Sequence, residues 1–282
     1  MANETISTSI DELSAIMIAE ARLVMANRQD LRKICTKRPV GEGNISVRFP
    51  KYANQAAAAQ GSEGQEVANS EVTTTGVVLT PAINAAWSTV VGDLAKHNAP
   101  QVMADLGRLA GDAIIKKLNA DIFALFDGFS VSIGTTNTDL TMAVVRLGLK
   151  KLQQASAHGP VYFVMTPEVW EDILADLATY NGANVMLSDT MRDAINRGLI
   201  DPQISLYGVS PIVVTSGISE ATDVKCGLLT QGALGYAEAW DIKVVAQERG
   251  KVVGTEVTAS AAYAVGEIED AFGIEVIADG AD

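Results

Sequence analysis

Histidine and cysteine are the side chains that most often form metal or nucleophilic sites, and this 282-residue chain has only two of each. His97 and His158 each lie beside a turn residue, and neither Cys35 nor Cys226 has a histidine near it in the sequence. A zinc site needs several clustered ligands, and a reactive thiolate needs a neighbouring base. The spacing therefore predicts no metal site and no activated thiol, and it gives the histidines a structural or solvent-exposed role.

Glycine loops and carboxylate pairs do not indicate catalysis either. Gly41 to Gly43 lacks the third glycine and the following helix of a nucleotide-binding loop, and no Gly-x-Ser-x-Gly turn is present. The adjacent pairs Glu171/Asp172 and Glu269/Asp270 should point to different sides, which suits no acid–base dyad. We therefore expect no catalytic residue, no cofactor and no enzyme, unless distant residues converge in the folded chain.

Charge is distributed unevenly along the chain. The formal net charge of −13 argues against a protein whose main task is to bind phosphate backbones. The stretch from Arg28 to Lys51 is an exception, because it has seven basic residues and two acidic ones. Two interpretations stay open: a solvated basic face, or an arm that meets an acidic surface of another copy or lies near nucleic acid.

The composition is typical of a packed protein that folds in a reducing compartment. Hydrophobic residues make up 48% of the chain, and two cysteines give no disulfide framework. Met1 is followed by no basic and apolar leader, and no apolar run reaches the ~20 residues that span a bilayer. We expect a soluble protein that folds in the cytoplasm and contacts no membrane.

The first third of the chain predicts an arm and a projecting ribbon. Ser9 to Glu12 fits a capping box, which predicts a helix to about Asn27. Alternating residues predict a strand from Ile45 that ends at Pro50, and a second strand over 72–79. The segment 53–71 between them has almost no large apolar side chain. We therefore expect an extended β-hairpin that projects from the body.

Two helices are expected next. Thr80-Pro81 resembles a helix start and predicts a short helix through Trp87 to Val91. A long helix is expected over 98–126, where Gly107 and Gly111 indicate close packing or a bend. Its expected apolar face consists of Val102, Leu106, Leu109, Ala113, Ala120 and Phe123.

The remaining chain alternates helices and strands before it ends in β-structure, so the fold class is α+β. Helices are expected at 139–157, 167–177 and 191–199, and strands at 161–165, 212–215 and 227–230. A hairpin with strands at 242–247 and 252–264 and a last strand at 273–278 complete the chain.

This order of parts, with several local segments, resembles the Hong Kong-97-type major capsid proteins of tailed bacteriophages. The segments are Val161 to Pro167 with Trp170, Leu206 to Val214, Gly232 to Ala237, Glu248-Arg249, Ala262 to Val265 and Gly273 to Val276. The resemblance implies an N-terminal arm at 1–40, an extended β-hairpin (the E-loop) at 41–80, and the spine helix with the first part of the P-domain at 81–136. An inserted A-domain would occupy 137–235, and P-domain strands with a return to the A-domain would occupy 236–282.

The resemblance also implies a function. The chain would assemble into pentamers and hexamers of an icosahedral phage head that encloses double-stranded DNA, and it would reside in the virion after assembly in the host cytoplasm. Its partners would be other copies of itself, a portal protein, packaged DNA contacted non-specifically on the inner face, and a scaffold protein. Some relatives carry a long N-terminal scaffolding segment, whereas here the arm starts almost at Met1, so we expect a separate scaffold or a trimmed chain.

Opposed charge indicates where neighbouring subunits would touch. The hairpin acids Glu63, Glu66 and Glu71 could meet basic residues such as Arg38 or Arg48 of a neighbour, and Lys51 belongs to the same candidate set of contacts. Two other functions stay open. One is the shell protein of an encapsulin-type bacterial cargo compartment, and the other is a monomeric enzyme or ligand-binding domain.

Overall fold

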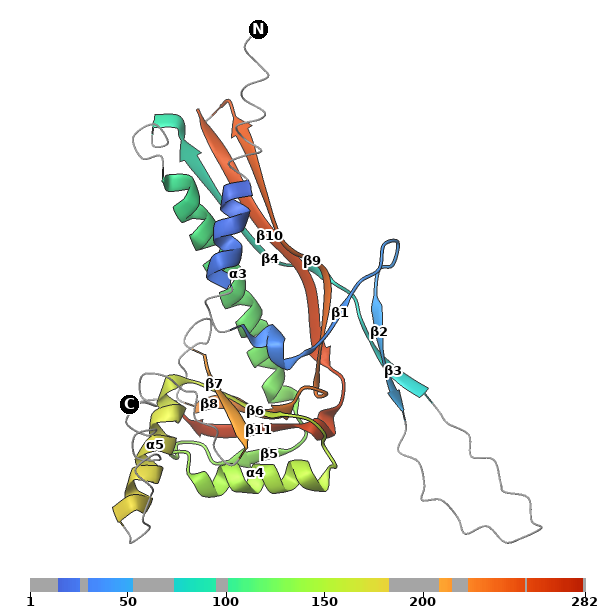
Figure 1. Ribbon diagram of the computed structural model, residues 1–282, viewed down its shortest axis with the longest axis vertical. Coiled ribbons are helices and arrows are strands. Elements are labelled where there is room, and N and C mark those ends of the chain that lie inside the picture. Colours follow the sequence, from blue (N-terminus) through green and yellow to red (C-terminus); the bar gives the residue numbers. More distant parts are fainter. Residues whose placement is uncertain are drawn as a thin grey trace, which may run out of the picture.

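The computed structural model describes residues 15–25, 30–52, 74–94, 101–182, 208–214, 223–251 and 253–280. Figure 1 shows an elongated part with a long helix and a four-stranded sheet, a five-stranded sheet at one end of it, and a two-stranded ribbon at its side. Among the described residues, no helix combines the length and the apolar character needed to cross a bilayer.

The elongated part is built on a long hairpin. β9 (Leu234–Arg249) and β10 (Gly254–Glu267) pair antiparallel, β4 (Ala82–Gly92) adds to β10, and β1 (Thr36–Pro39) runs parallel to β9 at the other edge. Side chains alternate between two faces along β10, and Val257, Ala259 and Ala261 are buried. This buried face lies against α3 (Val102–Phe123).

The predicted short helix from Thr80 to Val91 is wrong, because this segment forms β4. Pro81 immediately precedes the strand, a position that does not require a backbone N–H in the ladder. Ala85 and Val91 are buried while the residues beside them are exposed, which is the two-residue period of a strand. Ten register pairs with β10 outweigh the local resemblance to a helix start.

The predicted long helix is confirmed as α3, which continues into the 3₁₀ turn η2 (Ala124–Gly128). Its predicted apolar face is wrong in part, since Leu109 is 57% exposed whereas Met103, Ala110 and Ile114 are buried. The buried sector is wide because α3 contacts the sheet on one side and a helix over residues 15–25 on another.

Gly107 and Gly111 explain how the helix over 15–25 approaches α3. A Cβ atom at Gly107 would lie 2.6 Å from the carbonyl oxygen of Met17, and one at Gly111 would lie 2.6 Å from that of Ala21. Real Cβ atoms do not approach backbone so closely, so the two helices touch where α3 has no side chains. The prediction of close packing at these glycines is confirmed, whereas the capping box at Ser9 lies outside the described residues.

The second sheet has the order β5-β11-β8-β6-β7. Its strands are β5 (Ser132–Gly134), β11 (Gly273–Asp279), β8 (Asp223–Thr230), β6 (Val161–Met165) and β7 (Val209–Val213). A Cβ at Gly148 of α4 (Met142–Gln154) would meet Leu228, and one at Gly227 would meet Phe126 of η2. Leu228 and Gly227 are neighbours on β8, so α4 and η2 cover opposite faces of the sheet. The predicted helix at 191–199 lies outside the described residues.

The predicted start of the next helix is confirmed as α5 (Pro167–Gly182), which follows β6 directly. The ribbon consists of β2 (Val47–Tyr52) and β3 (Thr74–Leu79), which pair antiparallel. Pro50 lies inside β2, so the prediction that it ends the strand is wrong. A two-stranded ribbon leaves each strand one free edge, where a missing N–H costs no ladder bond. The predicted projection, 53–71, lies outside the described residues.

Candidate assembly surfaces

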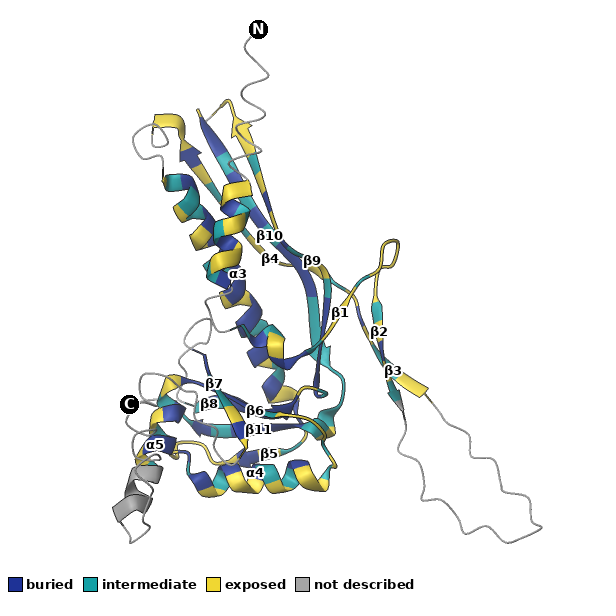
Figure 2. Ribbon diagram, viewed as in Figure 1, coloured by how far each residue is buried: buried dark blue, intermediate teal, exposed yellow. Residues whose placement is uncertain are grey.

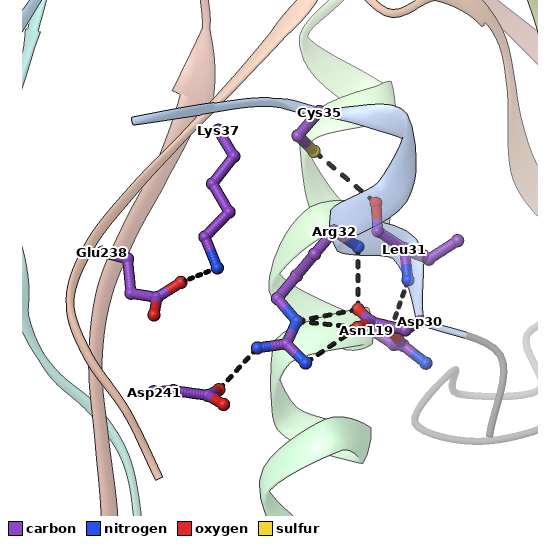
Figure 3. A network of polar contacts seen from close by, with 8 residues as sticks. All are labelled: Asp30, Leu31, Arg32, Cys35, Lys37, Asn119, Glu238 and Asp241. Carbon is purple, nitrogen blue, oxygen red and sulfur yellow. Dashed lines mark hydrogen bonds and ion pairs between the residues drawn. The ribbon is translucent and has the colours of Figure 1, made fainter. Parts of the chain in front are cut away.

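A network of polar contacts fixes the chain between the N-terminal helix and β1 to the rest of the molecule (Figure 3). Asp30 caps the 3₁₀ helix η1 (Leu31–Ile34), and its carboxylate accepts hydrogen bonds from the backbone N–H and the Nε of Arg32, both at 2.9 Å. Nη1 of Arg32 also donates to Asp241 of β9 at 2.6 Å. Burial alone would lower the pKa of Arg32, but Asp30 and Asp241 outweigh it and raise that pKa above its ordinary value.

Three of the six described cations in the predicted basic segment pair with acids of the same chain. Besides Arg32, Lys37 of β1 forms an ion pair with Glu238 of β9, and Lys51 of β2 lies 2.7 Å from Glu269. These pairs fasten β1 and β2 to the terminal strands. Within the subunit these three cations are therefore paired with acids of the same chain, and a contact of Lys51 with another copy stays a prediction.

Arg38 and Arg48 meet at the base of the ribbon. The guanidinium of Arg38 lies 5.4 Å from the centre of the Phe49 ring and donates to the backbone oxygen of Arg48 at 3.4 Å. Both arginines are exposed. Glu63, Glu66 and Glu71 lie outside the described residues, so the contact between these acids and a neighbour's arginines stays a prediction.

A second carboxyl cluster joins the end of β10 to the ribbon and to η2. The backbone N–H of Ser130 donates to Asp270 at 2.7 Å, and the Ser130 hydroxyl also bonds this carboxylate. Burial, with a contribution from the hydrogen bond to Asp270, raises the pKa of Glu267 to about 7. Burial acts to raise the pKa of Asp270 as well, but the hydrogen bonds from Ser130 outweigh it and lower that pKa. The sequence showed only two adjacent solubilising acids here.

Glu267→Gln should remove a pH dependence of stability. Below the ordinary pKa both the folded and the unfolded chain hold the proton; between about 4.5 and 7 only the folded chain does, so stability falls as pH rises through this window. Glutamine cannot ionise and still donates to Asp270. We expect equal melting temperatures near pH 4.5 and a higher one for the variant at pH 8. Glu248→Gln, at an exposed position, is the control variant. If the difference in melting temperature between Glu267→Gln and the unmodified protein were the same at every pH, the prediction would be contradicted.

The face of the four-stranded sheet that points away from α3 carries exposed apolar side chains, and Figure 2 shows exposed residues alternating with buried ones along β4. We call it the outer sheet face, and its large apolar members are Ile83 (60% exposed), Val90 (42%), Trp240 (41%) and Val245 (49%). The register aligns Ile83 and Trp240 on either side of Ala262. Between the apolar members lie small residues such as Ser88, Thr258 and Ser260, together with the charged Lys243 and Glu256.

The outer sheet face ends at an open strand edge. β4 has β10 on one side and, within the described part of the chain, no strand on the other. An edge of 11 residues beside exposed apolar side chains is a surface that another chain can cover or extend.

Within the described ranges, no group of three or more His, Cys, Asp or Glu side chains could hold a metal ion. Cys35 and Cys226 are buried, and burial raises the pKa of both thiols to about 12. His158 is exposed, and His97 lies outside the described residues.

Comparisons with known proteins agree with this architecture. The phage capsid protein family matches residues 90–277, which include most of the elongated part and nearly all of the five-stranded sheet. The capsid structure of the cyanophage P-SCSP1u is 13% identical with a TM-score of 0.63, covering 90% of each chain. A protein of Microbacterium phage Oxtober96 is 12% identical with a TM-score of 0.66, covering 87% of this chain and 89% of that one.

A virus-like particle has a similar fold. The virus-like particle of Pyrococcus furiosus is 12% identical with a TM-score of 0.59, and the match covers 93% of this chain and 98% of that one. No curated protein matches the sequence. Because the family matches about two thirds of the chain and the structural matches extend over nearly all of it, this chain belongs to the phage capsid protein family, has the Hong Kong-97-type fold, and is a structural protein of the virion capsid.

Proposed function

We propose that this chain assembles into the pentamers and hexamers of an icosahedral phage head that encloses double-stranded DNA. The observation that carries the proposal is the outer sheet face, which exposes large apolar side chains and an unpaired strand edge on a protein of a capsid family. Burial of such a face between copies would be favourable, since each Å² of apolar surface removed from water contributes about 25 cal/mol.

The domain boundaries implied by the resemblance are part of the proposal. The arm at 1–40 and the hairpin at 41–80 would contact adjacent subunits, and the part at 137–235 would meet its copies around the five-fold and six-fold axes. A separate scaffold protein and a portal protein would take part in assembly in the host cytoplasm.

Electron microscopy of the purified protein tests the proposal. Negative-stain images should show closed shells, and size-exclusion chromatography should show a particle far larger than the 29.7 kDa subunit. A stable monomer that never forms shells, with or without a scaffold, would rule the proposal out in favour of a monomeric function.

An encapsulin-type cargo compartment is the second candidate. The similarity to the Pyrococcus furiosus virus-like particle, which covers nearly all of both chains, is the observation behind this candidate, because that particle is not described as a phage head. The contents of purified particles separate the two functions. Packaged double-stranded DNA supports the phage head, whereas a co-purifying enzyme found by mass spectrometry supports the cargo compartment.

Placing charge on the outer sheet face should block assembly without unfolding the subunit. Val90 and Val245 are both exposed, so Val90→Glu with Val245→Glu removes no core contact. A charge buried between copies is costly, and we expect the yield of shells to fall by at least about tenfold, equivalent to 1.4 kcal/mol. Leu109→Glu changes an exposed apolar residue of α3 and is the matched control. Normal shells from the double variant would exclude this face from the interface.

The hairpin acids give a second assembly prediction. If Glu63 and Glu66 meet Arg38 or Arg48 of a neighbour, Glu63→Lys with Glu66→Lys should reduce assembly and change its salt sensitivity. Exposed ion pairs contribute about 0–1 kcal/mol each. These pairs should therefore affect how neighbouring subunits are aligned more than how strongly they associate. Adding Arg38→Glu and Arg48→Glu should restore assembly in part. Light scattering at several salt concentrations measures this, and an unchanged yield and salt response would refute the contact.

A further inference from the structure

α4 is the outermost layer on its side of the five-stranded sheet. Met142, Val145 and Leu152 are buried, and Gly148 lies so close to the sheet that a Cβ atom there would be 2.6 Å from Leu228. The opposite side of α4 is exposed along the helix, and no described element covers it (Figures 1 and 2).

The exposed side of α4 is basic. Arg146 and Lys150 are exposed one turn apart, Lys151 is half-buried beside them, and the apolar Leu147 between them is 46% exposed. The helix, with sequence MAVVRLGLKKLQQ, contains no carboxylate. We call these three cations the α4 basic face. It is exceptional in a chain with 34 acidic and 21 basic residues.

The cations of α3 show the contrast. Lys116 lies 2.8 Å from Asp112, and Arg108 lies 2.9 Å from Glu20, so these charges are neutralised within the chain. Within the described part of the protein, no ion pair joins Arg146, Lys150 or Lys151 to an acid. The α4 basic face therefore presents its charge outward.

Helix stability explains only part of this arrangement. The carboxylates of Asp172 and Asp176 on α5 accept hydrogen bonds from the N–H groups of Leu140 and Met142 at the start of α4, at 3.2 and 2.7 Å. Acids at the beginning and Lys151 in the last turn suit the helix dipole. Arg146, however, lies mid-helix one turn before Lys150, and like charges at this spacing destabilise a helix. Two like charges at this spacing are expected where the group that neutralises them belongs to another molecule.

We propose that the α4 basic face lies on the inner surface of the shell and contacts the phosphates of packaged double-stranded DNA. This rests on the proposed function, because it needs a shell that encloses DNA. Long exposed cations flanked by Gln153 and Gln154 suit a sequence-independent contact that displaces counterions. The centre of a protein interface is instead poor in lysine and rich in aromatic residues, which fits the outer sheet face with Trp240 better than α4.

Crosslinking in DNA-filled particles tests the assignment. Brief formaldehyde treatment joins lysines to nearby DNA, and mass spectrometry identifies the peptides. We expect DNA adducts on Lys150 and Lys151 and few on Lys116 and Lys117, which are the internal controls because they are paired with acids of α3. Adducts on the control lysines at equal yield, or none on Lys150 and Lys151, would overturn the proposal.

Variants give an independent readout. Arg146→Gln with Lys150→Gln and Lys151→Gln should reduce the slope of log affinity against log salt by about 2.7 for subunits binding random-sequence duplex, because three phosphate contacts are lost. Lys116→Gln with Lys117→Gln should leave the slope unchanged. If the triple variant has the same slope as the unmodified chain, the proposal is contradicted. It is also contradicted if the triple variant fails to form shells, because α4 would then contact an acidic surface of a neighbouring subunit. Failure of the unmodified chain to form shells counts instead against the proposed function.

Discussion

Replacing both Gly107 and Gly111 with alanine should destabilise the protein, although the same change in an exposed helix stabilises it. Alanine in place of glycine improves helix propensity by ~1 kcal/mol at each position. Each new Cβ would lie 2.6 Å from a backbone oxygen of the helix over 15–25, so that helix must move away. Exposure of Met17 and Met25 then costs about 1.5–3 kcal/mol each, which outweighs the gain.

Urea unfolding measures the net loss, which we expect to be about 1–4 kcal/mol. Release of the helix should also open Arg22 to trypsin, and the subunit should then be cut within the arm. Gly92→Ala is the control, because a Cβ at Gly92 meets nothing within 4 Å. A double variant that is more stable than the unmodified protein would show that the two helices do not pack in this way.

Arg32→Met should cause the second large loss of stability. The Arg32 and Asp30 side chains are only 14% and 11% exposed, so removal of the guanidinium leaves a carboxylate that is largely shielded from water and has lost its counterion. Breaking a buried pair from one side costs about 3–5 kcal/mol, and we expect about 3 kcal/mol here because the second partner, Asp241, is 35% exposed. Urea unfolding gives the value.

Two companion variants make the Arg32 measurement specific. Lys116→Met removes one cation from an exposed pair within α3 and should cost less than about 1 kcal/mol. Arg32→Lys keeps the charge, but its compact ammonium lacks the planar, widely spaced donors with which the guanidinium binds both Asp30 and Asp241. Its stability should therefore lie between those of Arg32→Met and the unmodified protein. If Arg32→Met costs no more than Lys116→Met, the network in Figure 3 contributes little to stability.

Elements with a strong local signal could be predicted from the sequence. β6 is a short apolar run between a glycine–proline turn and a Thr-Pro helix start, and its bounds agree with the prediction. α3 was predicted because its apolar residues recur at helical spacing. β4 was not, because Thr80-Pro81 resembles a cap and the strand is stabilised by a partner about 170 residues away.

The error at β4 also hid part of the candidate interface. The outer sheet face requires Ile83 and Val90 to lie beside Ala262 and Glu256 of β10, and a helix over 81–91 would not pair with that strand. Contacts over long sequence distances were equally unpredictable. The bond between Arg32 and Asp241 spans 209 positions, and no local pattern in either segment indicates it. The cations of the α4 basic face lie within the helix predicted at 139–157, but that prediction included Asp139, which precedes α4 in the structure.

The long β9–β10 hairpin has a mechanical consequence. It extends from the junction with the five-stranded sheet to the far tip of the elongated part, and its backbone hydrogen bonds run across the strands. A force that slides β10 along β9 therefore loads the whole ladder in shear, and many bonds share the force instead of opening one after another. The same hairpin is soft to forces that peel β10 from β9 starting at its open end, so the subunit should resist sliding of the two strands far better than unzipping.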